Sequence, residues 1–242
     1  MRVRLAVVTA AEEVPWGSVL APGRGVVYDV LGRVAPELGR RLHEHGEGPH
    51  GMAPFGHGAP VFSSARRRPG RYAAGGRGVV EFGSPVPAIV EALAAGFAER
   101  ELLDWGGVAL RLTGLGLVEP PEFADGRAVL RTSTPVVMKG SGYGADGVRG
   151  PRQAWVLPTE LEWAGYFQGN LRRKAETLGL DAGVSLESVS WVGPKRSFAV
   201  GQGAKPGAAV EVELSGAPET LRALWSWGLG QANSAGFGWV AA

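Results

Sequence analysis

The sequence predicts an α+β protein made of two tandem ferredoxin-like (RRM-like) βαββαβ domains. The chain has 242 residues, of which 45% are hydrophobic, so it can form one large globular domain or two small ones. Periodicity predicts the order strand, helix, strand, strand, helix, strand, which is the split βαβ pattern of a ferredoxin-like domain. The same order occurs twice without a strong sequence repeat. We therefore expect domains at 1–126 and 127–242.

The first half predicts one copy of this pattern. Residues 2–10 alternate and are rich in β-branched side chains, which is typical of a strand. A helical repeat of apolar residues follows, with spacings of three and four: Val27, Leu31, Val34, Leu38 and Leu42. Because proline is not tolerated inside a helix, Pro36 predicts a break near Ala35 and a second helix that ends at Gly46. The remaining expected elements are strands over 59–64 and 78–82, a helix over 86–102 and a strand over 105–120.

The second half predicts the other copy. We expect strands over 127–140, 185–193, 208–216 and 235–240, and helices over 158–179 and 217–230. Residues 140–153 are rich in glycine and predict a loop. Residues 195–207 are expected to be strand in part.

The composition excludes several classes of site. The absence of cysteine rules out disulfides, thiolate nucleophiles and Cys-type zinc or iron–sulfur sites. No window approaches the roughly 18 apolar residues of a membrane span, and the N-terminal apolar run ends at Glu12 and Glu13, so we expect no membrane segment, no signal peptide and a cytoplasmic location. The net charge is only +2, but all four lysines lie in the second half: Lys139, Lys174, Lys195 and Lys205. This bias is compatible with a local basic face.

Residues 228–240 read GLGQANSAGFGWV and concentrate four glycines in two pairs: Gly228, Gly230, Gly236 and Gly238. The segment lacks the GK[ST] of a P-loop, and Asn233 stands where a Rossmann fingerprint needs its third glycine. It also runs from a predicted helix to a predicted strand, the reverse of a Rossmann turn, so a nucleotide cofactor is disfavoured. Two interpretations stay open: a glycine-lined turn, or an anion-binding loop in which backbone, Asn233 and Ser234 contact an RNA phosphate.

The glycine segment closely resembles the C-terminal glycine-rich loop of the RAMP superfamily of CRISPR-associated proteins. In particular, it is similar to the stand-alone endoribonuclease that cuts CRISPR repeat RNA into guide RNAs. Further segments resemble the same family, in order along nearly the whole chain: the Y…LHE segment over 26–46, GVVEF followed by PVPAIVEALAAGF, TSTPVVM, and LPTELEWAGYFQGNLRRKAETLG. That family has two tandem ferredoxin-like domains, in agreement with the predicted order of elements.

The resemblance implies a substrate and a reaction. CRISPR repeat RNA is the expected partner, cleaved when its 2′-OH attacks the adjacent phosphate. A general base, a charge stabiliser and a proton for the leaving 5′-oxygen are sufficient. The implied enzyme is thus a metal-independent endoribonuclease that leaves a 2′,3′-cyclic phosphate and a 5′-OH, with no metal and no cofactor.

All four histidines lie between residues 43 and 57: His43, His45, His50 and His57. Histidine titrates near neutrality and is the usual general acid or base. The LHE motif of the family makes His43 the expected catalytic histidine, with His45 as its rival, and the assisting upstream tyrosine corresponds to Tyr28. A straight helix would separate Tyr28 from His43 by about 22 Å, so this pairing requires the second helix to fold back at Pro36.

One position departs from the family pattern, in which a lysine often follows this histidine. The sequence has no lysine before Lys139. His50 lies near the expected position, and Arg40 or Arg41 could also supply the positive charge. Two other roles are compatible with these histidines. His43 could interact only with a helix dipole, and the His-x-His-x4-His pattern could bind zinc or nickel.

Basic residues of the second half are further candidate RNA contacts: Arg172, Arg173, Lys174, Lys195 and Arg196. The first three form a run late in a predicted helix, where a solvated face is an equally good interpretation. The last two begin a possible basic hairpin. Phosphate contacts from such residues would make binding depend on salt.

Three functions remain in view. The Y…LHE segment favours the endoribonuclease over a non-catalytic RAMP-type RNA-binding subunit of a CRISPR effector complex. An unrelated tandem ferredoxin-like protein would leave the ordered motifs unexplained. Binding to other effector-complex subunits and formation of a homodimer are both compatible with the sequence.

Overall fold

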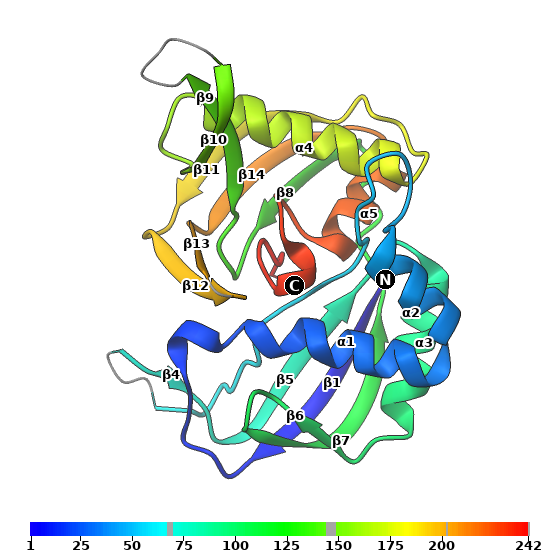
Figure 1. The fold of residues 1–242 in the computed structure, drawn as a ribbon. Coiled ribbons are helices and arrows are strands. Elements are labelled where there is room, and N and C mark those ends of the chain that lie inside the picture. Colours follow the sequence, from blue (N-terminus) through cyan, green and yellow to red (C-terminus); the bar gives the residue numbers. More distant parts are fainter. Residues whose placement is uncertain (67–69, 144–148, 202, 242) are drawn as a thin grey trace.

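Two antiparallel sheets organise the structure, a computed structural model that describes residues 1–66, 70–143, 149–201 and 203–241, without side chains for 141–154. The sheets belong to two tandem ferredoxin-like domains, which confirms the predicted fold class. In Figure 1 the first domain lies below the second, and the C-terminal segment lies between them.

The first sheet has the strand order β3-β5-β1-β7-β6. Its strands are β1 (Arg2–Thr9), β3 (Gly56–His57), β5 (Gly76–Gly83), β6 (Leu102–Asp104) and β7 (Ala109–Val118). Its helices are α1 (Ala21–Val34), α2 (Pro36–Glu44) and α3 (Pro87–Ala98). A short ladder of β2 (Glu13–Val14) with β4 (Tyr72–Ala73) and the 3-10 turn η1 (Trp16–Ser18) complete this half.

Alternation along β1 positions the first core. Val3, Leu5 and Val7 are at most 1% exposed, because every second side chain of a strand points to the same face. Helices α1 and α3 contribute buried apolar residues to the same cluster, among them Val27 and Leu93. The first domain therefore fixes the position of α1 against the sheet.

Pro36 breaks the predicted helical segment into two, as expected. Ala35 has φ −147° and ψ 63°, outside the helical region. The proline ring disfavours helical dihedral angles at the residue that precedes it. α2 then folds back against α1, and Gly39 allows a close approach, since a Cβ there would lie 3.2 Å from the Cβ of Leu31. The second helix ends at Glu44, two residues before the expected Gly46.

The second sheet has the strand order β11-β14-β8. Its strands are β8 (Arg127–Arg131), β11 (Ser185–Val192) and β14 (Val210–Ser215), and its helices are α4 (Trp163–Thr177) and α5 (Pro218–Trp227). Two hairpins are inserted into this domain: β9 (Met138–Tyr143) with β10 (Arg149–Val156), and β12 (Arg196–Val200) with β13 (Gly203–Gly207).

Some predicted elements differ from the structure. The strand expected over 59–64 is reduced to a single bridge between Val61 and Val79. The strand expected over 127–140 is interrupted around Pro135, which has no N–H to donate to a ladder. The loop expected over 140–153 is largely the β9–β10 hairpin, although 144–148 lie outside the described residues.

The closing strand expected over 235–240 is also absent. Val240 forms one bridge with Thr132, and a 3-10 turn, η2 (Asn233–Ala235), precedes it. Gly236 and Gly238 have φ values of 85° and 64°, which are incompatible with extended strand backbone.

A buried arginine joins the two domains. Arg2 of β1 is fully buried, and its Nη2 donates to the carbonyl oxygen of Trp225 on α5 at 2.6 Å. The guanidinium carbon lies 3.5 Å from the ring centroid of Trp225 and 4.1 Å from that of Trp239. Burial lowers the pKa of Arg2 to about 9, against the opposing effect of Glu81. This packing fixes the position of α5 and the C-terminal segment relative to the first sheet.

Candidate active site

The fold-back of α2 brings Tyr28 and His43 together. Their ring centroids are 5.2 Å apart in an edge-to-face arrangement, and the Tyr28 hydroxyl donates to the carbonyl oxygen of Leu42 at 3.5 Å. His43 is exposed in the last turn of α2, whereas Tyr28 is half-buried against Phe55. The predicted proximity is confirmed, and the catalytic roles stay predictions.

Burial and a nearby cation have opposite effects on the pKa of Tyr28. Desolvation raises the pKa of its hydroxyl, and the adjacent guanidinium of Arg24 partly offsets this. The net effect is a raised pKa, so the phenol keeps its proton at neutral pH and can serve as a hydrogen-bond donor.

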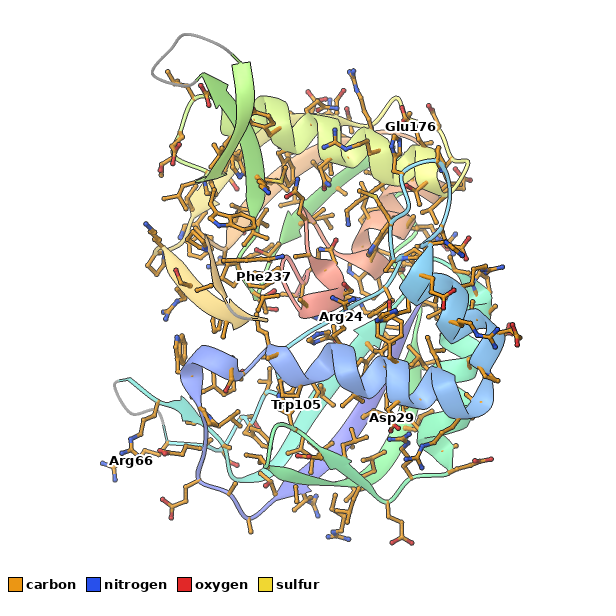
Figure 2. The ribbon with its side chains drawn as sticks, in the orientation of Figure 1. Arg24, Asp29, Arg66, Trp105, Glu176 and Phe237 are labelled. Carbon is orange, nitrogen blue, oxygen red and sulfur yellow. The ribbon has the colours of Figure 1, made fainter. Side chains whose placement is uncertain are left out.

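The other two candidate histidines differ from His43 in their partners. His45 follows α2, is mostly exposed and has the Glu44 carboxylate 3.8 Å from its Nε2. His50 lies in a turn that reaches the second domain, where its Nε2 is 2.6 Å from a carboxylate oxygen of Glu176 on α4. Figure 2 shows Glu176 at the end of α4, beside this turn and away from α1.

The glycine segment is buried rather than open at the surface. Gly228, Gly230, Gly236 and Gly238 are all buried with positive φ. Their close neighbours belong to the protein: a Cβ would lie 2.6 Å from Val136 at Gly230, 2.6 Å from the His57 ring at Gly236, and would collide with the Leu229 carbonyl at Gly238. In this conformation the glycines permit tight packing between the domains, and they present little backbone to a ligand.

Asn233 and Lys174 form the buried centre of this segment. The Nζ of Lys174 donates to the Gly228 carbonyl at 2.8 Å and to the Asn233 side-chain oxygen, and it lies 4.1 Å from the Trp227 ring centroid. The amide of Asn233 donates to two backbone carbonyls, those of Leu229 and Phe237. Burial holds the pKa of Lys174 well below its usual range. The RNA contact expected of Lys174 is therefore corrected to a structural contact, because only 1% of the residue is exposed.

The other residues expected to contact RNA are exposed or half-buried. Arg172 is exposed on α4, and Arg173 and Ser234 are half-buried. Lys195 and Arg196 are exposed at the start of the β12–β13 hairpin, where the guanidinium carbon of Arg196 lies 4.8 Å from the Trp16 ring centroid. Their binding role stays a prediction.

Sequence reasoning missed the structural position of His57. This residue of β3 is fully buried between α1 and the glycine segment, and added Cβ atoms on Gly23 or Gly236 would collide with its ring. Its Nδ1 lies 3.1 Å from the Gly58 carbonyl oxygen, and burial lowers the pKa of the imidazole to about 4. The glycines on both sides of His57 in the sequence were the available signal of close packing.

Within the described part of the chain, no group of three or more His, Cys, Asp or Glu side chains is arranged to hold a metal ion. The helices of the described residues include none long and apolar enough to cross a membrane.

A groove of about 860 Å³ lies between α3 and α5, but none of the candidate residues lines it.

Comparison with solved structures identifies the fold. A structure described as a RAMP protein binding different RNA substrates has a TM-score of 0.81 at 14% identity, and covers 99% of this chain and 98% of that chain. A structure described as CRISPR associated protein Cas6 has a TM-score of 0.78 at 20% identity, with coverages of 100% and 98%. A Cas6-related protein from Pyrococcus furiosus has a TM-score of 0.78 at 13% identity, with coverages of 100% and 97%. The fold is thus that of the RAMP proteins.

The family follows from the sequence of the second half. Residues 118–242, just over half of the chain, match the family model for the C-terminal part of CRISPR associated protein Cas6. The chain belongs to the Cas6 family, whose members are endoribonucleases that process CRISPR repeat RNA. A search of the curated proteins found no match.

Proposed function

We propose that this chain cleaves CRISPR precursor RNA within its repeats, without a metal, through the Tyr28–His43 pair. The observation that carries the proposal is the 5.2 Å separation of the two rings in a member of the Cas6 family. A solved Cas6 product complex with a TM-score of 0.67 and 17% identity supports the same kind of substrate.

The proposed reaction needs one proton acceptor and one proton donor. His43 takes the proton of the ribose 2′-OH, whose oxygen attacks the adjacent phosphorus. The bond from phosphorus to the 5′-oxygen breaks, and Tyr28 protonates that oxygen. The products are a 2′,3′-cyclic phosphate and a 5′-OH, and the imidazolium of His43 returns a proton to the phenolate before the next turnover.

The environments of the two side chains suit these roles. His43 is exposed, so its imidazole is accessible to a substrate. Tyr28 has a raised pKa and keeps its proton until a stronger base appears, and the leaving 5′-alkoxide is such a base.

The test uses repeat RNA from the genome that encodes this chain, incubated with the protein in EDTA. We expect cleavage by the unaltered protein, loss of cleavage with retained binding in His43→Ala, and a large decrease in rate in Tyr28→Phe. His45→Ala is the matched control, because His45 is also exposed at the end of α2, and the ring pairs of Tyr28 are with His43 and Phe55.

Two results would change the proposal. Cleavage that survives His43→Ala but is lost in His45→Ala or His50→Ala would transfer the role of base and leave the function standing. Tight binding by the unaltered protein without cleavage would support a non-catalytic RAMP-type subunit of an effector complex.

A further inference from the structure

The side chains of α2 and of the following turn that were expected to supply positive charge lie beside acids in the structure. Each one near His43 has a carboxylate partner: Arg40 with Glu37 at 2.7 Å, Arg41 with Glu47 at 2.6 Å, and His50 with Glu176 at 2.6 Å. A carboxylate next to a cation reduces the charge available to an incoming phosphate. None of the three residues expected to supply positive charge is therefore well placed to do so.

Arg24 lies on the other side of the pair. It precedes Tyr28 by four residues, so both side chains share one face of α1, and its guanidinium carbon is 5.6 Å from the Tyr28 ring centroid. Asp29, the acid nearest to it in α1, is instead paired with Arg33 and Arg100. Among the described residues no carboxylate forms an ion pair with Arg24. Figure 2 shows this arginine on the side of α1 that faces the second domain.

Trp155 of β10 links two lysines of the second domain: Lys139 lies directly opposite it on β9, so both side chains share one face of the hairpin, and Lys205 lies over its ring. Lys205 of β13 is half-buried, and its pKa is lowered by desolvation first and then by the charges of Arg24 and Lys139. No carboxylate contributes to this shift. The Nζ of Lys205 also lies 5.5 Å from the ring centroid of Trp155.

The three cations come from three elements of two domains. Arg24 is on α1, Lys139 on β9 and Lys205 on β13. Lys205 is half-buried, whereas Arg24 and Lys139 are exposed. Like charges repel one another, and among the described residues no carboxylate forms an ion pair with any of the three. A bound anion would remove that cost, and a nucleic-acid backbone offers phosphates at regular spacing.

We propose that Arg24, Lys139 and Lys205 form a site for a backbone phosphate of the RNA, next to the Tyr28–His43 pair. The proposal rests on the RNA substrate of the proposed function. Arg24 borders Tyr28 and so also acts on the reacting phosphate, where it supplies the positive charge that a lysine provides in the family pattern. Lys139 and Lys205 contact the neighbouring backbone and position the strand.

The first experiment measures binding of the repeat RNA with a 2′-deoxy substitution at the scissile nucleotide, which prevents reaction. The variants Arg24→Gln, Lys139→Gln and Lys205→Gln should each weaken binding about fivefold, and each should reduce the slope of log affinity against log salt by about one. Arg111→Gln is the matched control, because Arg111 is exposed on β7 next to buried Leu110 and thus points to the opposite face of the sheet.

The single-turnover cleavage rate of each variant, measured with all of the RNA bound, distinguishes the roles of the three cations. Arg24→Gln should lower the single-turnover rate about 100-fold, with partial rescue in Arg24→Lys, whereas the two lysine variants should retain the rate. Equal binding, equal salt slopes and equal rates in all four charge variants would overturn the proposal.

A second experiment does not depend on RNA processing. Tripolyphosphate should raise the melting temperature of the unaltered protein and of Arg111→Gln, but not that of the triple variant of Arg24, Lys139 and Lys205. If the protein fails to cut repeat RNA yet shows this difference, the anion site stands and the proposed function fails. If it cuts the RNA and tripolyphosphate stabilises all variants equally, the site fails and the function stands.

Discussion

Two histidines lie against the same helix, and their surroundings differ. Tyr28 of α1 contacts His43, which is exposed at the end of α2. Gly23, earlier in α1, packs against His57, which is fully buried between the domains. Residue type is the same at both positions, so burial and neighbours decide which histidine is available for chemistry and which one holds the structure together.

The largest expected effect would separate the two histidines directly. His43→Ala should lower the cleavage rate by about 100- to 10,000-fold, the usual contribution of a general base, and change the free energy of unfolding by less than about 0.5 kcal/mol. His57→Ala should leave the cleavage rate per folded molecule similar and destabilise the fold by about 3 kcal/mol, because it creates a cavity between the domains. Single-turnover kinetics and urea unfolding of both variants test this. Equal losses of rate in both would remove the distinction.

The next effect concerns the buried lysine below the glycine segment. Lys174→Met should cost about 3 kcal/mol of unfolding free energy, because the carbonyl of Gly228 and the amide oxygen of Asn233 lose their donor. Arg172→Met in the same helix should change it by less than about 0.5 kcal/mol, since Arg172 is exposed. Denaturant unfolding measures both. A stable Lys174→Met variant with weakened RNA binding would instead support the predicted direct contact between Lys174 and RNA.

The glycine segment gives a third test. Gly238→Ala should destabilise the protein by about 2 kcal/mol, because its φ of 64° is strained for alanine and the new Cβ would collide with the Leu229 carbonyl. Gly165→Ala in α4 should instead stabilise it by about 0.5 kcal/mol, since nothing lies within 4 Å of that position. Thermal and urea unfolding distinguish the two signs. A tolerated Gly238→Ala would contradict the close packing of the segment.

Acid pH should weaken the interface at His57. Its folded pKa of about 4 lies below the unfolded value of 6.5, so the unfolded chain binds the extra proton. The associated stability is full above pH 6.5 and is lost as the pH falls toward 4, with about 2 kcal/mol lost between pH 7 and pH 5. His57→Gln should reduce this pH dependence, whereas His45→Gln should retain it. Unfolding at several pH values in all three proteins decides the point.

The smallest expected effect belongs to the ion pair between the domains. His50→Gln should change the free energy of unfolding by less than about 1 kcal/mol and the cleavage rate by less than about threefold, because the pair with Glu176 is partly exposed. Glu176→Gln should behave in the same way. A rate loss of about 100-fold in His50→Gln alone would give His50 the catalytic role that we propose for Arg24.

The sequence predicted much of this arrangement from local rules. The helical repeat and Pro36 were sufficient to predict two helices with a break near Ala35, because proline restricts its own residue and the one before it. The pairing of Tyr28 with His43, which the resemblance to the family implied, required the second helix to fold back at this break. The first strand was accessible because the alternation of β1 is typical of a strand with one covered face.

Other features were not accessible because they depend on what packs against a residue. The run Arg172–Arg173–Lys174 reads as three similar cations, yet α4 turns Lys174 inward onto Gly228 and Asn233. Arg24, Lys139 and Lys205 are far apart in the chain, and no local pattern connects them. Positive φ at the C-terminal glycines replaced the expected last strand by a packed turn.

By itself, the sequence determined the fold class and the helix break, because periodicity and proline act over a few neighbouring residues. The tertiary structure alone decided which of the chemically equivalent side chains face solvent. His43 and Arg24 remain exposed, whereas His57 and Lys174 are enclosed by the glycine segment. Desolvation depends on contacts between distant segments, so it is a property of the packed molecule and not of any stretch of its sequence.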